Sequence, residues 1–313
     1  MKGLELSEKF YIEYGLSLLE KSFPDVLRVA AIGLCGSGSE CFGYDDEISR
    51  DHDFEPGFCI FIPDESVVDE KTAFELEKAY SSLPKSFMGY ERSTVGAVGG
   101  HRHGEIRLNS FLAEKTGTID GILQLKDWFY IPEQALAELT NGKIFRDDSG
   151  CFTEIRERLS YFPEDVRLKK LAGNLLLMGQ AGQYNYLRCV KRGETAAAQL
   201  AIGEFAKSAI NVMFLLNRKY VPYYKWSFRA LRELGLLSHL HIDLEHLISS
   251  DNTEAEVKLK KQLIEKICME IFSELKEQGL TKFMGTQAEG HAYAVNNEIQ
   301  NNDLRNRHIL YGV

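Results

Sequence analysis

The stretch that decides the fold is Val29 to Phe54, which reads VAAIGLCGSGSECFGYDDEISRDHDF. Its apolar start, Val29 to Leu34, predicts a strand that leads into the small-residue turn Cys35 to Glu40. A strand that feeds such a turn brings backbone N–H groups close to phosphate oxygens. After a polar segment the stretch reaches two acids, Asp51 and Asp53, separated by one residue.

The two acids carry the chemistry that this stretch predicts. Acids at i and i+2 on a strand project from the same face, where they hold one or two hard divalent cations. We therefore predict that Asp51 and Asp53 bind Mg²⁺ or Mn²⁺ and act in nucleotidyl transfer, with a nucleoside triphosphate as co-substrate. A solvated loop is the alternative interpretation. The predicted nucleotide-binding residues are Gly36, Ser37, Ser39 and Arg50.

The composition limits the class of protein. The length of 313 residues predicts two domains. A formal net charge of −9 argues against a protein that binds nucleic acid in bulk, although a local basic pocket would suffice for a nucleotide. No stretch is expected to span a membrane, and the N-terminus does not have the pattern of a signal peptide. Six scattered cysteines indicate reduced thiols in a cytoplasmic protein rather than a zinc site.

Periodicity divides the chain near Gly150. Residues 1–150 alternate helices and strands, which predicts an α/β (or α+β) domain with a small mixed sheet. Residues 151–313 show helical periodicity almost throughout, which predicts an all-α helical bundle that binds the substrate. The main expected elements of the first domain are a helix over Leu6–Ser22, strands over Val29–Leu34 and Gly57–Pro63, a helix over Glu65–Ser82, a strand over Glu105–Phe111 and a helix over Glu133–Leu139.

The Gly-Ser turn, a spacer of thirteen residues and the Asp-x-Asp pair resemble a known superfamily. They are similar to the nucleotidyltransferase superfamily that includes DNA polymerase beta and the aminoglycoside nucleotidyltransferases. Within it, the chain resembles an uncharacterised bacterial family, a domain of unknown function. That resemblance implies the fold and the reaction type, but no acceptor. The segments that carry it are 36–40, 49–53, 127–128 with 132–134, 161–166 and 222–226.

The superfamily often uses a third carboxylate on a later strand, and Glu105 is the candidate here. It would ligate a second metal or take the proton from an attacking hydroxyl; the alternative is a solvent-facing strand residue. Glu55 competes for this role, because it follows Asp53 at i+2. His52 stands where many members carry an apolar residue and is interpreted as a packing residue.

Two histidines flank Arg102 in the segment His101 to His103. They lack a third partner at metal-ligand spacing, so we predict a surface or pocket-rim position and no zinc. The pair His52-Asp53 also occurs in metal phosphohydrolases of the HD type. Those enzymes need further His and Asp residues on helices, which this sequence does not show at suitable spacing.

The helical half offers two candidate acceptor sites. Tyr184 and Arg188 lie four residues apart on one polar stripe, which is either a pocket wall or a solvated face. Lys225 and Trp226 would supply a cation and a stacking surface, or else form an aromatic corner of the core. All four are predicted substrate-binding residues.

The predicted function is therefore a metal-dependent nucleotidyltransferase. It would move a nucleoside monophosphate to a hydroxyl of a small molecule or a protein side chain, and the acidic surface would suit a cationic acceptor such as an aminoglycoside. The alternative is a binding module without catalysis, such as a nucleotide sensor or a toxin–antitoxin partner on the same fold.

Overall fold

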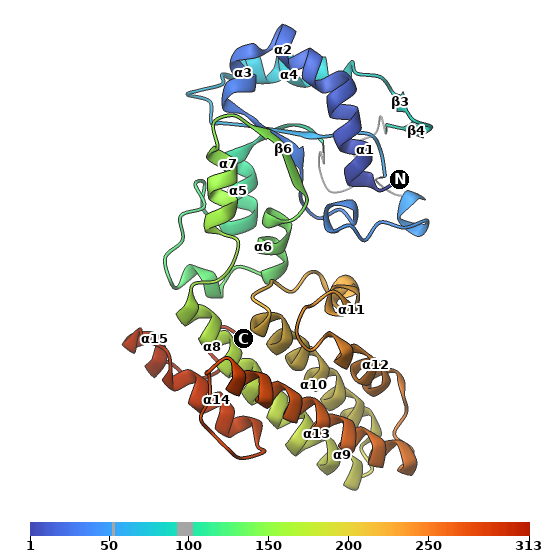
Figure 1. Ribbon diagram of the computed structural model, residues 1–313, viewed down its shortest axis with the longest axis vertical. Helices are drawn as coiled ribbons and strands as arrows, with labels where there is room; N and C mark the ends of the chain where they lie inside the picture. The colour runs from blue at the N-terminus through green and yellow to red at the C-terminus, as the bar shows by residue number, and fades with distance from the viewer. Residues whose placement is uncertain (52–53, 93–102) are drawn as a thin grey trace. The chain divides into compact units, whose positions relative to one another are not determined.

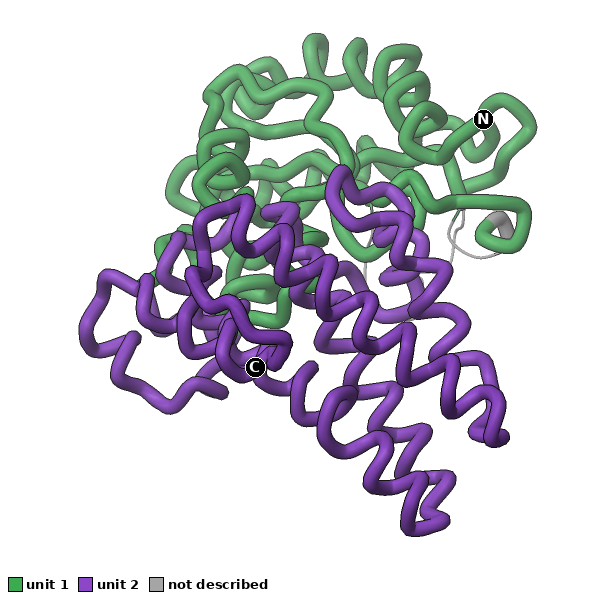
Figure 2. The backbone as a smooth tube through the Cα atoms, turned by 60° about the horizontal axis from the view of Figure 1, so that its bottom comes forward, with its two compact units in different colours: residues 1–124, 131–160 green, residues 125–130, 161–313 purple. Residues whose placement is uncertain are grey.

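A computed structural model describes residues 1–313 apart from 52–53 and 93–102, and apart from the side chains of residues 50 and 51 (Figure 1). The chain divides into two compact units (Figure 2). The α/β unit comprises Met1–Gln124 and Ile131–Ser160, and the helical unit comprises Leu125–Tyr130 and Tyr161–Val313. The sequence predicted a domain boundary between residues 150 and 151. In the structure, α7 (Cys151–Arg158) belongs to the α/β unit, and the short segment 125–130 belongs to the helical unit.

The α/β unit alternates short helices and strands. Its α-helices are α1 (Gly3–Phe10), α2 (Leu16–Ser22), α3 (Pro24–Val29), α4 (Glu70–Ser81), α5 (Leu108–Thr116), α6 (Glu133–Thr140) and α7. A π-helix, η1 (Tyr11–Gly15), joins α1 to α2, and the 3-10 helices are η2 (Glu40–Phe42) and η3 (Ile48–Asp51). The strands are β1 (Ala31–Leu34), β2 (Cys59–Ile62), β3 (Ser86–Phe87), β4 (Tyr90–Glu91), β5 (Gly104–Arg107) and β6 (Lys143–Asp147).

Four strands form a mixed sheet in the order β5-β2-β1-β6, while β3 and β4 pair separately. Strand β1 is antiparallel to both β2 and β6, and β2 is parallel to β5. All four residues of β1 and of β2 are buried. This confirms that the apolar run before the Gly-Ser turn forms a central strand, since strands covered on both faces read as continuous apolar runs.

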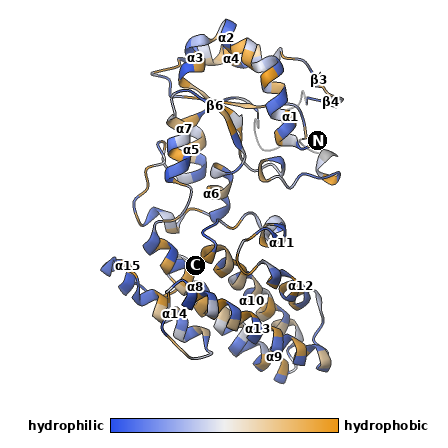
Figure 3. Cartoon of the chain, in the orientation of Figure 1, coloured by the Kyte–Doolittle hydropathy of each residue, from blue (hydrophilic) through white to orange (hydrophobic). Residues whose placement is uncertain are grey.

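Helices cover both faces of the sheet, with α1 to α4 on one side and α5 and α7 on the other (Figure 1). On the first face Ile32 and Ile60 pack into a cluster with Phe10 of α1 and Leu76 of α4. On the second face the ring centroid of Phe61 lies 4.7 Å from that of Phe152 and 5.2 Å from that of Phe111. Figure 3 shows hydrophobic and hydrophilic residues alternating along most helices, as expected of helices that pack by one face.

Two expected strands differ from the structure. The strand expected over Glu105–Phe111 ends at Arg107, and α5 begins at Leu108. Leu108, Phe111 and Leu112 are spaced i, i+3, i+4 and buried, so their pattern is helical rather than alternating. The first strand begins at Ala31 instead of Val29, because the helix α3, which Pro24 starts, continues to Val29.

The helical unit contains helices and no strand among its residues, all of which are described. Its elements are η4 (Asp127–Phe129), α8 (Glu164–Met178), the π-helix η5 (Gly179–Tyr186), α9 (Leu187–Lys191), α10 (Thr195–Leu216), α11 (Tyr224–Arg232), η6 (Ser238–Leu240), α12 (His241–Ser249), α13 (Glu254–Glu277), α14 (Ala288–Asn297) and α15 (Asn302–Asn306). Helix α8 packs against α10 and α14 and has twelve buried residues, so it forms the centre of this core.

Helix α10 corrects one expectation. The sequence predicted no stretch that is long and apolar enough to span a membrane, but α10 has 22 residues and meets that criterion by length and composition. Of its most apolar 18-residue window, 67% is buried inside the structure, as in a core helix.

All six cysteines lie in the described part of the chain, and none of them forms a disulfide.

Candidate functional site

The turn after β1 is held in place from a distant part of the sequence. Gly36 has a φ of +130°, a conformation that only glycine adopts readily. Its N–H donates to Oδ1 of Asn141 over 2.9 Å, and Nδ2 of Asn141 donates to the Gly36 carbonyl over 2.7 Å. Both backbone groups of Gly36 are therefore engaged, so Gly36 shapes the turn and its N–H is not available to a phosphate.

Ser37 is the most exposed residue of the turn Cys35 to Glu40 and carries two hydrogen-bond donors. Ser37 is exposed, and within the described part of the chain neither its N–H nor its hydroxyl makes a hydrogen bond. Ser39 is half-buried and precedes η2, and its carbonyl accepts from the N–H groups of Phe42 and Tyr44. The turn thus presents Ser37 to solvent from the end of a buried central strand.

The chain just before the acidic pair forms a turn that the side chain of Asp46 caps. Oδ1 of Asp46 accepts hydrogen bonds from the N–H groups of Ile48 and Ser49, which starts η3. Asp51 is the last residue of η3, so its expected position on a strand is wrong, and β2 begins only at Cys59. The same-face argument from strand alternation therefore does not apply to it.

Four predicted residues at or next to the acidic pair have no described position or no described side chain. Asp53 and His52 lie outside the described residues, as do the side chains of Arg50 and Asp51. The arrangement of the two carboxylates stays a prediction from the sequence. Among the described residues, no group of three or more His, Cys, Asp and Glu side chains is placed to hold a metal.

Glu105 lies on β5 in register with Ile60 of β2, and so on the face that α4 covers. Its side chain is 20% exposed, and its Oε1 lies 3.8 Å from Nε of Arg107. That oxygen is buried without a hydrogen-bond partner. Burial raises the pKa of Glu105, Arg107 opposes the shift, and Glu77 and Glu70 add to it. A carboxyl with a raised pKa and an open oxygen suits proton transfer or a hard cation.

Replacing Glu105 by Gln is expected to stabilise the chain at neutral pH by on the order of 1 kcal/mol. The charged form is disfavoured in the folded state, so the wild type loses stability as the pH rises through the raised pKa of Glu105. Gln carries no charge and avoids that loss. Below the ordinary value of 4.5 the wild-type carboxyl is protonated too, and the difference should vanish. Urea unfolding at acidic and at neutral pH measures the free energy of unfolding of the wild type and the variant.

Glu91→Gln, at an exposed position, is the control. An equal gain in stability from Glu91→Gln would contradict the explanation.

A second pair of polar side chains lies at the beginnings of the paired strands β2 and β5. Nδ1 of His103 lies 3.1 Å from Oε1 of Glu55, with side chains 8% and 22% exposed. Gly57 makes room for this pair, since a Cβ there would lie 2.7 Å from Cγ of His103. The sequence predicted a surface or pocket-rim position for His103; its side chain is largely buried and lies against Glu55, the acid that competed with Glu105. His101 and Arg102 lie outside the described residues.

In the helical unit, Tyr184 lies in the π-helix η5 and Arg188 in α9. The guanidinium of Arg188 stands 4.5 Å from the centre of the Tyr184 ring, and both residues are exposed. π-helices are rare and occur often at functional sites. A cavity of about 500 Å³ exists in this unit, but its lining comes from α8, the loop after α13 and residues near 298–300, without Tyr184 or Arg188.

Lys225 and Trp226 lie in the first turn of α11. The ammonium of Lys225 lies 5.0 Å from the centre of the Trp226 ring. The neighbouring rings of Tyr223 and Tyr224 have centroids 4.4 Å apart and are 40% and 75% exposed. Tyr223, Tyr224 and Lys225 are exposed and Trp226 is half-buried, so these side chains form a partly exposed aromatic and cationic surface. Binding of a base or sugar there stays a prediction.

Comparison with known families gives one finding. Residues 128–227 match a family described as "Domain of unknown function (DUF4037)". The match covers about a third of the chain and includes Tyr184, Arg188, Lys225 and Trp226. It does not reach the Gly36–Asp53 stretch, so the resemblance to nucleotidyltransferases rests on that stretch alone. A search of curated proteins finds no match.

Two features of the site were missed in the sequence. Asn141 is not among the predicted site residues, although it holds the Gly36 backbone 105 residues away. The Glu55–His103 pair joins residues 48 apart. No local pattern reveals such partners, because the parallel pairing of β2 and β5 and the pairing of β1 and β6 bring them together.

Proposed function

We propose that the chain is a metal-dependent nucleotidyltransferase of cytoplasmic location, with a nucleotidyltransferase fold in its α/β unit. The observation that carries the proposal is Ser37, an exposed residue after the central strand β1 whose N–H and hydroxyl make no hydrogen bond within the described part of the chain. In the sequence, Asp51 and Asp53 follow after a spacer of thirteen residues. A turn that offers donors to phosphate, followed by paired carboxylates, supports transfer from a nucleoside triphosphate.

The donor set suits Mg²⁺ or Mn²⁺. Asp51 and Asp53 supply carboxylate oxygens, the ligands that hard cations prefer, and Glu105 has a buried oxygen without a hydrogen bond. Asp51 and Asp53 would hold the metal. When bound, it would neutralise triphosphate charge and lower the pKa of the acceptor hydroxyl.

The residues of the chain have separate parts in the proposed reaction. Ser37 holds the phosphates through its N–H and hydroxyl, in a turn that Asn141 fixes. Glu105 takes the proton from the acceptor hydroxyl, since its raised pKa suits a general base near neutral pH. The acceptor oxygen then attacks the α-phosphorus, and pyrophosphate leaves. Tyr184, Arg188, Lys225 and Trp226 are the proposed contacts for the acceptor, whose identity the proposal does not specify.

A second candidate is nucleotide binding without transfer. It is favoured by the position of Glu105, whose carboxylate lies on the face covered by α4 and within 3.8 Å of Arg107. Such a carboxylate would serve the fold rather than the reaction. This candidate includes a nucleotide sensor or a partner in a toxin–antitoxin pair.

Nucleotide binding and transfer, measured together on Glu105→Gln, separate the two candidates. The enzyme proposal expects binding to persist while transfer falls by roughly 100-fold or more, as for the loss of a general base. Binding that persists with no transfer by the wild type, for any acceptor in a metabolite panel, would favour the second candidate. Failure of the wild type to bind any nucleoside triphosphate would contradict both.

A further inference from the structure

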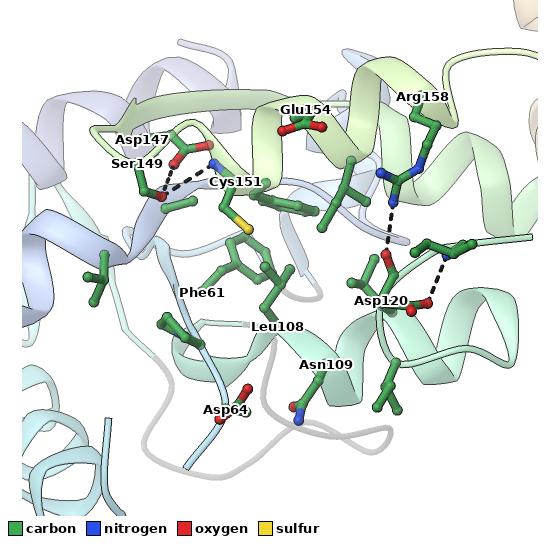
Figure 4. A pocket seen from close by; sticks show the side chains of 18 residues that line it. Phe61, Asp64, Leu108, Asn109, Asp120, Asp147, Ser149, Cys151, Glu154 and Arg158 are labelled. Carbon is green, nitrogen blue, oxygen red and sulfur yellow. Dashed lines mark hydrogen bonds between the residues drawn. The ribbon is translucent and has the colours of Figure 1, made fainter. Parts of the chain in front are cut away.

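A cavity of about 350 Å³ opens on the α/β unit between the sheet, α5 and α7 (Figure 4). Ligand pockets in proteins commonly begin at roughly 300 Å³. Most of its lining residues are apolar: Phe61, Leu112 and Phe152 are almost fully buried, while Leu108 and Ile155 keep a small exposed surface. In Figure 4 the thiol of Cys151 points from the first turn of α7 toward Phe61. The cavity therefore has a hydrocarbon interior that a small apolar group would fill.

The cavity is separate from the proposed nucleotide site. It contacts Val29 and Ala31 at the start of β1, whereas the turn at Gly36 follows the end of that strand. Five residues of extended chain span about 16 Å. A small ligand in the cavity would not reach Ser37, so this site goes beyond the proposed function and does not depend on it.

The polar residues around the cavity are mostly acidic. Four carboxylates contribute to the lining, and Figure 4 shows them around the apolar centre: Asp64, Asp120, Asp147 and Glu154. Two hydrogen bonds from Ser66 lower the pKa of Asp64, which keeps it ionised at neutral pH. The cationic member of the lining, Arg158, donates to the carbonyl of Asp120 over 2.9 Å. The rim therefore has a net negative charge.

The loop beside the cavity exposes two large apolar side chains. Ile119 and Ile122 are 67% and 63% exposed, and both belong to the lining. Isolated exposed residues of this kind are common, but two next to an apolar cavity extend one continuous surface. A ligand that fills the cavity would also cover this pair and remove their apolar area from water.

We propose that this cavity binds a small organic cation that has a hydrocarbon body and one ammonium group. The hydrocarbon occupies the apolar part of the cavity, against Leu108, Ile155 and the exposed Ile119 and Ile122, and the ammonium lies among the carboxylates of the rim. Charge complementarity selects a cation over a neutral or anionic molecule of the same shape. The apolar floor favours a hydrocarbon body over a polyhydroxylated one.

Three probes with the same eight-carbon chain test this proposal on the full-length protein. They are octylammonium, 1-octanol and octanoate, each used below the concentration at which it aggregates. The readout is the rate at which iodoacetamide alkylates Cys151, followed by peptide mass spectrometry, with Cys189 of the helical unit as an internal reference. We expect octylammonium to slow alkylation of Cys151 at lower concentration than octanol, and octanoate to have the weakest effect.

Two substitutions in α7 test whether a carboxylate of the cavity rim attracts the ammonium group. Glu154 lines the cavity, and Glu157 is an exposed acid of the same helix outside the lining. Glu154→Gln should weaken protection by octylammonium roughly two- to fivefold, the size expected for an exposed ion pair. Glu157→Gln should leave it unchanged. Circular dichroism confirms that both variants are folded.

Each outcome of these measurements either supports or overturns the proposed cation site. Selective protection by octylammonium, weakened only by Glu154→Gln, supports the proposal. Equal protection by octylammonium and octanol, equal effects of the two variants, or no protection of Cys151 by any probe would each overturn it. None of these measurements involves a nucleotide, so their failure leaves the proposed transferase function untouched.

Discussion

A chain in which Asp51 and Asp53 are both replaced by Asn is expected to lose nucleotide transfer roughly a thousandfold or more, while remaining folded. Asn keeps the volume and the hydrogen-bonding capacity of Asp but removes the charge that a divalent cation needs. The variant should also lose the Mg²⁺-dependent part of its affinity for a nucleoside triphosphate. Transfer of a labelled nucleotide and titration calorimetry, each with and without Mg²⁺, measure the two losses.

The control removes the same amount of charge elsewhere in the α/β unit. Asp25 and Asp148 are exposed and form surface ion pairs with Arg28 and Arg146. Such pairs contribute little to stability, so Asp25→Asn combined with Asp148→Asn should leave transfer and binding near wild type. Equal activity in the Asp51/Asp53 variant and this control would remove the metal mechanism.

Gly142→Ala is expected to lower the free energy of unfolding by about 3 kcal/mol or more. Gly142 has a φ of +62°, and a Cβ at this position would overlap the carbonyl oxygen of Leu34 at the end of β1. Because that contact is with backbone, no side-chain rotation relieves it. Neighbouring Asn141 holds Gly36, so the displacement should also disturb the turn that carries Ser37.

Gly117 provides the matched control for that substitution. It has a φ of +77° at the end of α5, but a Cβ there would meet nothing within 4 Å. Gly117→Ala should therefore cost only the backbone strain, about 1–2 kcal/mol. Urea unfolding followed by circular dichroism gives both values. If the two variants lose equal stability, the contact with Leu34 has no effect and the explanation fails.

The sequence predicted well those elements whose signal is local. The apolar run before the Gly-Ser turn is a buried central strand, and Glu133–Thr140 is a helix after Pro132. The helical character of residues 161–313 was also predicted. Short elements failed more often: the strand expected over Glu105–Phe111 ends at Arg107, and α5 begins at Leu108.

The candidate site could be predicted only in part, because its geometry depends on contacts between distant segments. The Gly-Ser turn follows from residue types, but the role of Asn141 requires the pairing of β1 with β6. The choice between Glu105 and Glu55 requires knowing that Glu105 pairs with Ile60 and that Glu55 contacts His103. The alternation expected of a strand does not apply to Asp51, because this residue ends η3 and does not lie on a strand.

The most direct measurement of the proposed reaction compares two labelled forms of a nucleoside triphosphate, one with ³²P at the α-phosphorus and one with ³²P at the γ-phosphorus. Each is incubated with the full chain, Mg²⁺ and a panel of hydroxylated metabolites and proteins. Nucleotidyl transfer predicts that label from the α position enters an acceptor, that pyrophosphate is released in equal amount, and that chelation of Mg²⁺ stops both. Entry of the γ label into an acceptor, or no transfer of either label to any acceptor, would contradict it.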